Sequence, residues 1–424
     1  MADALLSPAV GGTIWAASAG AIAYCSSKVR TEIDDRKVPL MGVLGAFLFA
    51  AQMINFTIPA TGSSGHLGGG LLLTILLGPY AAVLTIASVL VVQALFFADG
   101  GLLALGCNIL NLGILPAFIA YPLMYRPVAG RNPSTARVAA ASMAAAISGL
   151  QLGAFSVVLE TTLSGISSLP FTTFVSLMQP IHLAIGIVEG IVTAIIVGFV
   201  QKARPDLFTE KDVSKASIMM GIIPGVLALA LITGGFISWF ASEHPDGLEW
   251  SINKITGKEE FDGTKDSIHG RLSAIQGKLA FLPDYNFKKP EDKKEPSAGV
   301  EPAKAAESRR GTSLSGIVGA LITLGLAVLI GLILRKRQES AALKPHAHEH
   351  AHPHEHCHDH PHRHGDRYHS HDHGHQHSHP HPHVHDHSQP HQKDPNPQHT
   401  HPVRVAEHVH EHPDHEHEDH NHGH

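Results

Sequence analysis

The chain has only three cysteines among its 424 residues, and Cys25, Cys107 and Cys357 lie too far apart to form a CxxC pair. That scarcity excludes a disulfide framework. The chain also lacks a G-x-x-x-x-G-K-[ST] loop and a G-x-S-x-G elbow, so neither P-loop ATP hydrolysis nor a hydrolase nucleophile is expected. Basic residues sit in short loops rather than on one face, which argues against nucleic acid as a partner. We predict that the chain is not an enzyme.

Charged residues are also scarce over the first 200 positions. Several windows there contain about 20 apolar residues, the length that crosses roughly 30 Å of hydrocarbon. We therefore predict an all-α polytopic membrane protein in a lipid bilayer. The first window has no basic leader, so we interpret it as a retained span rather than a signal peptide.

Loop charges predict the topology. Basic clusters at 28–37, 126–137 and 202–215 belong on the cytoplasmic side of the inner (plasma) membrane. With the amino terminus outside and the cluster at 202–215 inside, the number of spans between them must be odd. The apolar windows then give seven spans. The predicted spans are Pro8–Ser27, Leu40–Ile58, Leu67–Gly78, Pro79–Phe97, Leu102–Tyr125, 138–159 and 174–200.

A second unit and a tail follow this bundle. We predict a two-span hairpin, formed by Ile218–Phe240 and Leu314–Leu334, around an external hydrophilic loop. The second span ends directly before the basic run Arg335–Arg337. The domains are therefore expected at 1–205, 206–337 (with external loop 241–311) and 338–424. The loop opens with a turn and an amphipathic stretch, at Pro245, Asp246, Gly247, Leu248 and Glu249.

The tail carries 31 of the 35 histidines. It cannot build a core, so we predict a disordered, cytoplasmic segment that chelates transition metals and buffers them. Its first candidate ligands are His346, His348, His350, His352, His354, His356, His358 and His360. Its composition does not choose the metal.

His66 is the only histidine in the first 181 residues, and it lies in the Gly- and Ser-rich stretch Asn55–Gly70 between two spans. Irregular backbone near membrane depth is tolerated only where it is buried or lines a cavity, and an imidazole there is a functional candidate. The predicted topology also places the Met1 amine outside. Amine, amide and imidazole nitrogens suit Ni(II) or Cu(II) and accept Co(II). We predict His66 and Met1 as metal ligands.

Other polar residues accompany these spans. Asn55 and Ser64 are candidates for contact with the ligands. His182 and Glu189 share one helix face; an interhelical hydrogen bond is the favoured interpretation, and a role in transport or coupling is the alternative. Asn108 and Asn111 are expected to join helices through hydrogen bonds.

Three stretches carry a family resemblance. Ala2–Pro8, the loop Asn55–Gly69 and Pro180–Gly190 resemble the substrate-capture component of energy-coupling-factor nickel/cobalt transporters. The segment His244–Trp250 between its two spans resembles the small accessory subunit of the same systems, here fused. The resemblance covers about residues 1–335 and implies a heptahelical bundle, in agreement with the span count.

This resemblance implies a mechanism. Ni²⁺ or Co²⁺ is bound outside by the amino-terminal amine, the second residue's amide and imidazole, and His66. A membrane coupling protein and cytoplasmic ATPases then drive release inward. The family begins Met-His, whereas this chain begins Met1-Ala2-Asp3. We expect that two residues are missing from the start of the gene model, with Met1 as the true third residue.

Two alternatives remain open at this point. One is a gradient-driven metal permease or exporter, although Asp99, Glu160 and Glu189 supply few acids for a proton relay. The other is a membrane-anchored histidine-rich metal store. Genes for an ATPase and a coupling protein nearby would favour capture for uptake, and transport that survives deletion of 340–424 would exclude the store.

Overall fold

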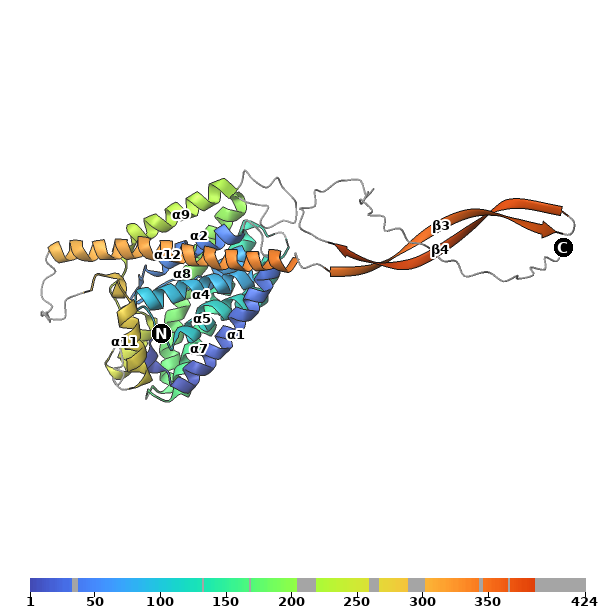
Figure 1. Cartoon of the computed structure of the whole chain (residues 1–424). Helices are drawn as coiled ribbons and strands as arrows, with labels where there is room; N and C mark the ends of the chain where they lie inside the picture. Colours follow the sequence, from blue (N-terminus) through green and yellow to red (C-terminus); the bar gives the residue numbers. More distant parts are fainter. Residues whose placement is uncertain are drawn as a thin grey trace. The chain divides into compact units, whose positions relative to one another are not determined.

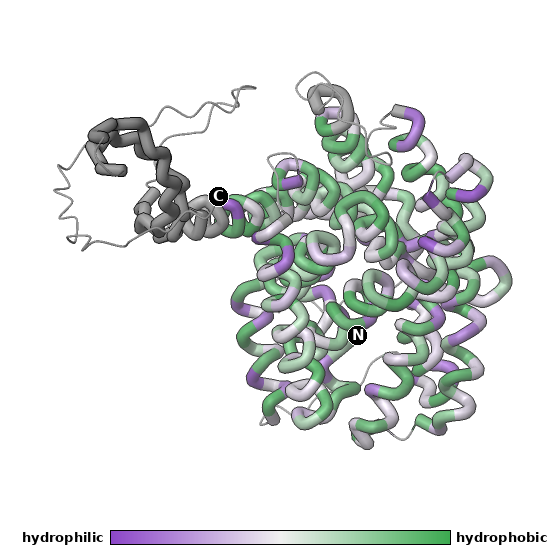
Figure 2. The backbone as a smooth tube through the Cα atoms, turned by 90° about the vertical axis from the view of Figure 1, so that its right-hand side faces the viewer, coloured by the Kyte–Doolittle hydropathy of each residue, from purple (hydrophilic) through white to green (hydrophobic). Residues whose placement is uncertain are grey.

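The structure is a computed structural model, and it describes residues 1–32, 37–131, 133–167, 169–203, 219–258, 267–288, 302–342, 346–364 and 367–385. The chain divides into two compact units, Met1–Ala341 and Ala342–His424. The first unit is a helical bundle with one small β-hairpin (Figure 1). Its helices are mostly hydrophobic along their length (Figure 2).

Helices overlap every stretch predicted as a span of the first domain. In order they are α1 (Pro8–Glu32), α2 (Lys37–Gln52), α3 (Gly70–Leu77), α4 (Pro79–Phe96), the continuous run α5 (Leu105–Ile109), η2 (Leu110–Ile114), η3 (Pro116–Tyr125) and α6 (Arg126–Ala129), then α7 (Thr135–Ser164) and α8 (Phe171–Ala203). The run from α5 to α6 contains π-helical turns around Pro116 and Pro122, because proline cannot donate the hydrogen bond of a regular α-helix.

Five of the described helices are long and apolar enough to cross a membrane: α4, the α5–α6 run, α7, α8 and the stretch Arg309–Arg335. The chain is therefore a multi-pass membrane protein. The count of seven spans plus two stays a prediction, because α2 and α3 are shorter. Glycines at positive φ bound α3, with Gly69 at 73° and Gly78 at 83°, and Pro79 then opens α4 at a position where its missing N–H costs little.

The second predicted span was wrong at its end. Helix α2 stops at Gln52, and Phe56–Ile58 forms strand β1, which pairs antiparallel with β2 (Ser63–Gly65). Alternating apolar and polar residues over 56–58 suit a strand better than a helix. Ala60 and Gly62, both at positive φ, make the connecting turn. The hairpin thus sits between two helices and leads directly to His66.

The described parts of the accessory region, 219–258, 267–288 and 302–342, pack onto the bundle of α1 to α8. They comprise α9 (Met219–Gly235), η5 (Ile237–Phe240), α10 (Gly247–Thr256), α11 (Ile268–Leu279), η6 (Pro283–Tyr285) and α12 (Pro302–Ala342). Small residues allow close helix approach: Gly316 of α12 lies against Gly234 of α9, and Gly319 lies against the ring of Phe49 in α2. The predicted flexible stretch at 288–296 lies, apart from Lys288, outside the described residues.

Helices α7 and α8 form an antiparallel pair. Their close contact uses Gly186 against Ile147 and Gly190 against Met143. On the other side of α8, apolar side chains spaced four residues apart are exposed, namely Leu183, Ile187, Ile191, Ile195 and Phe199. Residues at this spacing share one helix face, and such a face suits contact with lipid.

The prediction of a wholly disordered tail was wrong for 346–364 and 367–385. There β3 (His346–His364) pairs antiparallel with β4 (Arg367–His385). The register sets histidine opposite histidine, from His346 with His385 to His362 with His369. A histidine at every second position has the period of a β-strand, and the composition-based interpretation overlooked that periodicity.

Candidate metal site

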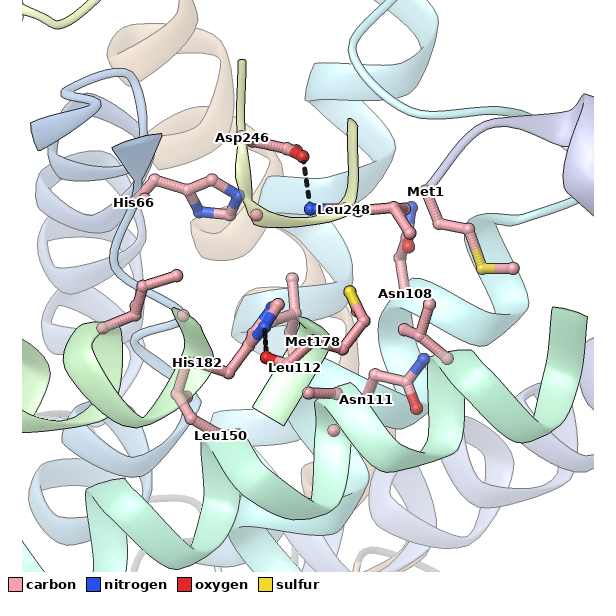
Figure 3. Close-up of a pocket in the computed structure, with 17 residues that line it drawn as sticks. Met1, His66, Asn108, Asn111, Leu112, Leu150, Met178, His182, Asp246 and Leu248 are labelled. Atoms are coloured by element: carbon pink, nitrogen blue, oxygen red, sulfur yellow. Dashed lines mark hydrogen bonds between the residues drawn. The ribbon is translucent and has the colours of Figure 1, made fainter. Parts of the chain in front are cut away.

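A pocket of about 110 Å³ lies where the His66 loop, the amino terminus and the accessory segment meet. His66, Met1, Asn108, Asn111, His182 and Asp246 all line it. Figure 3 shows His66 and Met1 on opposite sides, with the Asp246–Leu248 segment above and His182 below. The pocket therefore brings together both predicted ligands, although they lie 65 positions apart in the sequence.

The His66 ring extends from the end of the β-hairpin toward the accessory segment (Figure 3). Its Nδ1 lies 3.2 Å from the carbonyl oxygen of Leu67. If Nδ1 carries the proton, it donates to this carbonyl, and Nε2 keeps its lone pair. A neutral imidazole with one nitrogen fixed in this way is the usual form of a metal-binding histidine.

The amino terminus is fixed at the pocket by backbone contacts. The N–H of Gly101 donates to the Met1 carbonyl at 3.1 Å, and the N–H of Ala104 donates to Asp3 Oδ1 at 2.9 Å. Leu5 and Leu6 are buried behind these residues. Nothing in the composition of residues 1–6 predicts these contacts, since their partners come from a turn about 100 positions later.

The peptide after Leu67 is held on both sides. Glu189 accepts hydrogen bonds from the N–H groups of Gly68, at 2.7 Å, and Gly69, at 3.1 Å. Gln52 Nε2 donates to the Gly68 carbonyl at 2.9 Å. Glu189 is 2% exposed, and bonds to a charged acceptor in a buried site are strong. These contacts fix the backbone that carries His66.

The predicted interhelical bond of His182 and Glu189 is not what forms. Glu189 pairs with loop backbone, and His182 Nδ1 lies 2.8 Å from the Met178 carbonyl one turn earlier in α8. The His182 ring instead lies against Gly247: a Cβ at Gly247 would stand 3.1 Å from His182 Cε1 and 2.7 Å from Ile181 Cγ2. His182 thus forms part of the surface on which the accessory motif rests.

The predicted turn of the accessory motif lies at the start of helix α10. Asp246 caps α10 by accepting from the N–H groups of Leu248 and Glu249, both at 2.8 Å, and Glu249 accepts from the Asp246 N–H at 3.1 Å. This reciprocal capping box satisfies N–H groups that the first turn leaves unpaired. The cap holds Asp246, Gly247 and Leu248 in place over the pocket.

The motif also docks on the β-hairpin. The N–H of Ser64 donates to the Pro245 carbonyl at 2.8 Å, and Ser64 Oγ donates to the His244 carbonyl at 2.7 Å. Trp250 Nε1 donates to the Thr61 carbonyl at 3.0 Å, and the N–H of Ser242 donates to Asn55 O at 2.7 Å. Asn55 and Ser64, expected beside the ligands, are thus accessory-segment contacts.

Asn111 forms a polar side of the pocket. Its Nδ2 donates to both oxygens of Glu160 in α7, at 3.2 and 3.0 Å, so its predicted role in joining helices is confirmed. Its Oδ1 is buried and has no hydrogen-bond partner among the residues that the structure describes. A buried acceptor without a partner is costly, so Asn111 Oδ1 is an unsatisfied polar atom in the wall of the pocket.

A wider cavity of about 910 Å³ adjoins the pocket and shares His66, Met1 and Asn108 with it. Its acidic lining residues are Asp3, Asp99, Asp246, Glu249 and Asp284, and among the described residues no Lys or Arg lines it. Tyr285 also lines it and donates a short hydrogen bond to Asp99. Burial, followed by the negative charge of Asp99, raises the pKa of Tyr285 well above its usual value. The hydroxyl therefore stays protonated at neutral pH.

Within the described residues, no three His, Cys, Asp or Glu side chains form a metal cluster. The pocket instead offers the imidazoles of His66 and His182, the amino terminus and backbone groups, a nitrogen-rich set suited to Ni(II) or Co(II). Sequence reasoning missed Gln52, Gln93 and Tyr285, which line the wider cavity. The two glutamines interrupt apolar helices, a signal that could have identified them.

Two known protein families match separate parts of this chain. Residues 1–207 match the family described as the cobalt uptake substrate-specific transmembrane region (CbiM). Residues 220–336 match the PDGLE domain.

Three relatives illustrate the similarity. A protein of Archaeoglobus fulgidus, provisionally named fused nickel transport protein NikMN, is 36% identical over 338 residues, 76% of this chain and 95% of the relative. A provisionally named metal transport protein of Haloquadratum walsbyi is 37% identical over 218 residues, 51% of this chain and 96% of the relative. The cobalt transport protein CbiM of Sorangium cellulosum is 31% identical over 195 residues, 46% of this chain and 86% of the relative.

Proposed function

This chain belongs to the cobalt uptake substrate-specific transmembrane family, fused to a PDGLE domain, and on that premise we propose that it captures Ni²⁺ or Co²⁺ from outside for ATP-driven uptake. The family consists of metal transport components rather than enzymes. Its members work with other subunits. The metal is the transported substrate, and the relatives include nickel and cobalt transport proteins, so the choice between the two ions stays open.

One observation carries the proposal: His66 and Met1 line the same pocket, beneath the Asp246–Leu248 segment. The ligands in this proposal are a ring nitrogen of His66 and nitrogens of the amino-terminal segment. The clamp of Glu189 and Gln52 on Gly68 supports His66 as a fixed ligand. Asn111 Oδ1 is a further acceptor beside the ion, for a water or N–H group bound to it.

The acidic cavity supplies the route to this pocket. The acidic residues that line this cavity in the described part of the chain attract a divalent cation and raise its local concentration. Release inward requires work, and the chain has no P-loop of its own. A separate membrane coupling protein and cytoplasmic ATPases provide that work in our proposal.

The proposed placement is the inner (plasma) membrane, with the amino terminus outside. The domains are 1–205 for capture, 206–337 for the accessory unit with its external loop 241–311, and 338–424 for a cytoplasmic tail that buffers arriving metal. The basic run Arg335–Arg337 supports the tail's orientation. A tail protected from external protease on intact cells is the expected result, and cleavage from outside would contradict this orientation.

Uptake of radioactive nickel and cobalt tests the function in cells that express this chain with its coupling protein and ATPases. We expect His66→Ala to abolish energy-dependent uptake, and a Met-His extension before Met1 to increase it. Uptake without the ATPases would support a gradient-driven permease instead. Equal uptake by the extended and unextended chains would remove the amino terminus from the proposed ligand set.

A further inference from the structure

A basic pocket, separate from the metal site, lies where the α5–α6 run ends and the chain turns toward α7. Its volume is about 320 Å³, and Tyr121, Tyr125, Arg126 and Arg131 supply its polar side chains. Among the described residues no Asp or Glu lines it, and none of its lining residues belongs to the metal pocket or to the acidic cavity. The lining is therefore positively charged, and the capture of a cation does not explain it.

The turn that carries the arginines is closed by backbone contacts. Gly130 has a φ of 72°, and its N–H donates to the Arg126 carbonyl at 3.0 Å. After this turn Arg131 lines the same pocket as Arg126. Arg137 of α7 brings a third guanidinium to the turn, since a Cβ at Gly130 would stand 3.3 Å from its Nη1. Guanidinium groups bind phosphate oxygens in pairs, so this arrangement suits a phosphate group.

The wall of the pocket also contains an unsatisfied hydroxyl. Tyr125 is 5% exposed, and its hydroxyl has no hydrogen-bond partner among the described residues. Its ring stacks on Tyr121 with centroids 5.5 Å apart. The buried side chains of its cluster offer no acceptor, because they are those of Leu71, Ala129, Ala141, Ala145 and Ala146. A buried donor without a partner is costly, and an acceptor bound in the pocket would satisfy it.

The pocket lies at the depth of lipid head groups. The α5–α6 run is long and apolar enough to cross a membrane, and it ends at Ala129. Tyrosines at the end of a span belong to the interfacial layer, and basic pockets between spans bind acidic head groups there. On the same run Leu123, Met124 and Val128 are exposed. They offer an apolar surface for acyl chains beside the basic pocket.

We propose that this pocket binds the phosphate of an anionic phospholipid, a site that goes beyond the proposed function. Arg126 and Arg131 bind the phosphate oxygens, and the Tyr125 hydroxyl donates to one of them. A free phosphate ion has the same head-group chemistry, but it would leave the neighbouring apolar side chains uncovered. The lipid satisfies the charge of the pocket and that apolar surface together.

Thermal unfolding of the purified full chain in an uncharged detergent tests the site, with phosphatidylglycerol added at increasing concentration. A ligand that binds the folded chain raises the unfolding midpoint as its concentration rises. We expect phosphatidylglycerol to do so, and phosphatidylcholine with the same acyl chains to have a much smaller effect, because the arginines repel its choline group. Arg126→Gln and Arg131→Gln should each require about tenfold more phosphatidylglycerol for the same shift.

Tyr125→Phe tests the hydroxyl separately. Without lipid we expect the midpoint to be unchanged or higher, because the variant removes an unsatisfied group. With phosphatidylglycerol, the variant should require about three- to tenfold more lipid than the wild type for the same shift. A response to the lipid equal to that of the wild type would overturn the contact between the hydroxyl and the phosphate.

Arg30→Gln is the matched control, because Arg30 is an exposed arginine of α1 that does not line the pocket. It belongs to another basic cluster that is predicted on the same side of the membrane. We expect this variant to respond as the wild type does. An equal loss in Arg30→Gln would overturn the proposal, since overall charge would then explain the effect. Equal shifts from phosphatidylcholine would overturn recognition of the head group, and an equal shift from inorganic phosphate would overturn the lipid as the occupant.

Discussion

At the scale of single residues, the site depends on how one peptide is held. Gly68 follows His66 by two positions, and its N–H and carbonyl bond to Glu189 of α8 and Gln52 of α2. The ring of a histidine on a glycine-rich loop would otherwise sample many positions, since glycine restricts the backbone little. The buried polar contacts of Gly68 therefore give His66 its fixed place in the pocket.

Glu189→Gln tests this clamp. The amide has one acceptor oxygen where the carboxylate has two, so the N–H of Gly68 or Gly69 loses its partner. Hydrogen bonds to a charged group contribute about 1.5–3 kcal/mol, and we expect affinity for Ni(II) to fall about tenfold. Protection of the peptide 63–70 from hydrogen exchange, followed as the free Ni(II) concentration rises, measures this affinity.

Glu160→Gln is the control for that variant, because Glu160 is similarly buried, 3% exposed, but bonds to Asn111 and Ser156 rather than to the loop. We expect a smaller loss of affinity. Equal binding by Glu189→Gln and the wild type would show that the clamp does not position His66.

Part of this site could be predicted from the sequence. His66 was identifiable because a lone imidazole is unusual in a glycine-rich stretch between two apolar spans. Met1 followed because the predicted number of spans places the amino terminus on the same side of the membrane as the His66 loop. The clamp was not identifiable, because Gln52 and Glu189 meet the loop only after distant helices have packed. Local spacing suggested that His182 and Glu189 share a helix face, but it could not name their partners.

At the scale of elements, α10 and the β-hairpin form the contact that covers the pocket. The capping box at Asp246 starts the helix, and Pro245, His244 and Trp250 bond to the hairpin on either side of that start. The residues Pro245–Gly247 predicted a turn here, and that turn carries the cap of α10. The sequence did not predict the docking, because the first strand of the hairpin that receives α10, Phe56–Ile58, was itself interpreted as the end of a membrane span.

Gly247→Ala tests this docking. Alanine favours a helix over glycine by about 1 kcal/mol, so the change would stabilise an isolated α10. In the folded chain the new Cβ would lie 2.7 Å from Ile181 Cγ2 and 3.1 Å from His182 Cε1, and such a contact forces the helix away. We expect faster tryptic cleavage after Lys254, together with weaker retention of Ni(II).

Gly277→Ala is the matched control, because a Cβ at this glycine of α11 meets nothing within 4 Å. We expect cleavage after Lys254 and retention of Ni(II) to be the same as in the wild type. Unchanged cleavage in Gly247→Ala would mean that the accessory motif does not rest on α8 as described.

At the scale of the whole molecule, hydropathy and the positive-inside rule located the helices well. Each predicted span overlaps a helix, because long apolar runs must satisfy their backbone internally to cross a bilayer. Tail structure was the main error: alternating histidines lie in paired strands over 346–364 and 367–385, whereas composition alone suggested disorder.

Deletion of 342–424 separates the tail from the transporter. Residues 1–341 form a compact unit of their own, so we expect the truncated chain to remain folded and to support uptake. The number of Ni(II) ions bound per chain should fall strongly, since the deleted segment holds 31 of the 35 histidines. Uptake that disappears with the tail would favour a tail-based metal store over capture at His66.

The central claim is that the pocket of His66 holds the transported ion. The most direct test counts Ni(II) and Co(II) bound by purified residues 1–341, as wild type and as His66→Ala, with the Met-His extension present in both. We predict one tightly bound ion per wild-type chain and none in His66→Ala. An ion retained with unchanged affinity in His66→Ala would contradict the account.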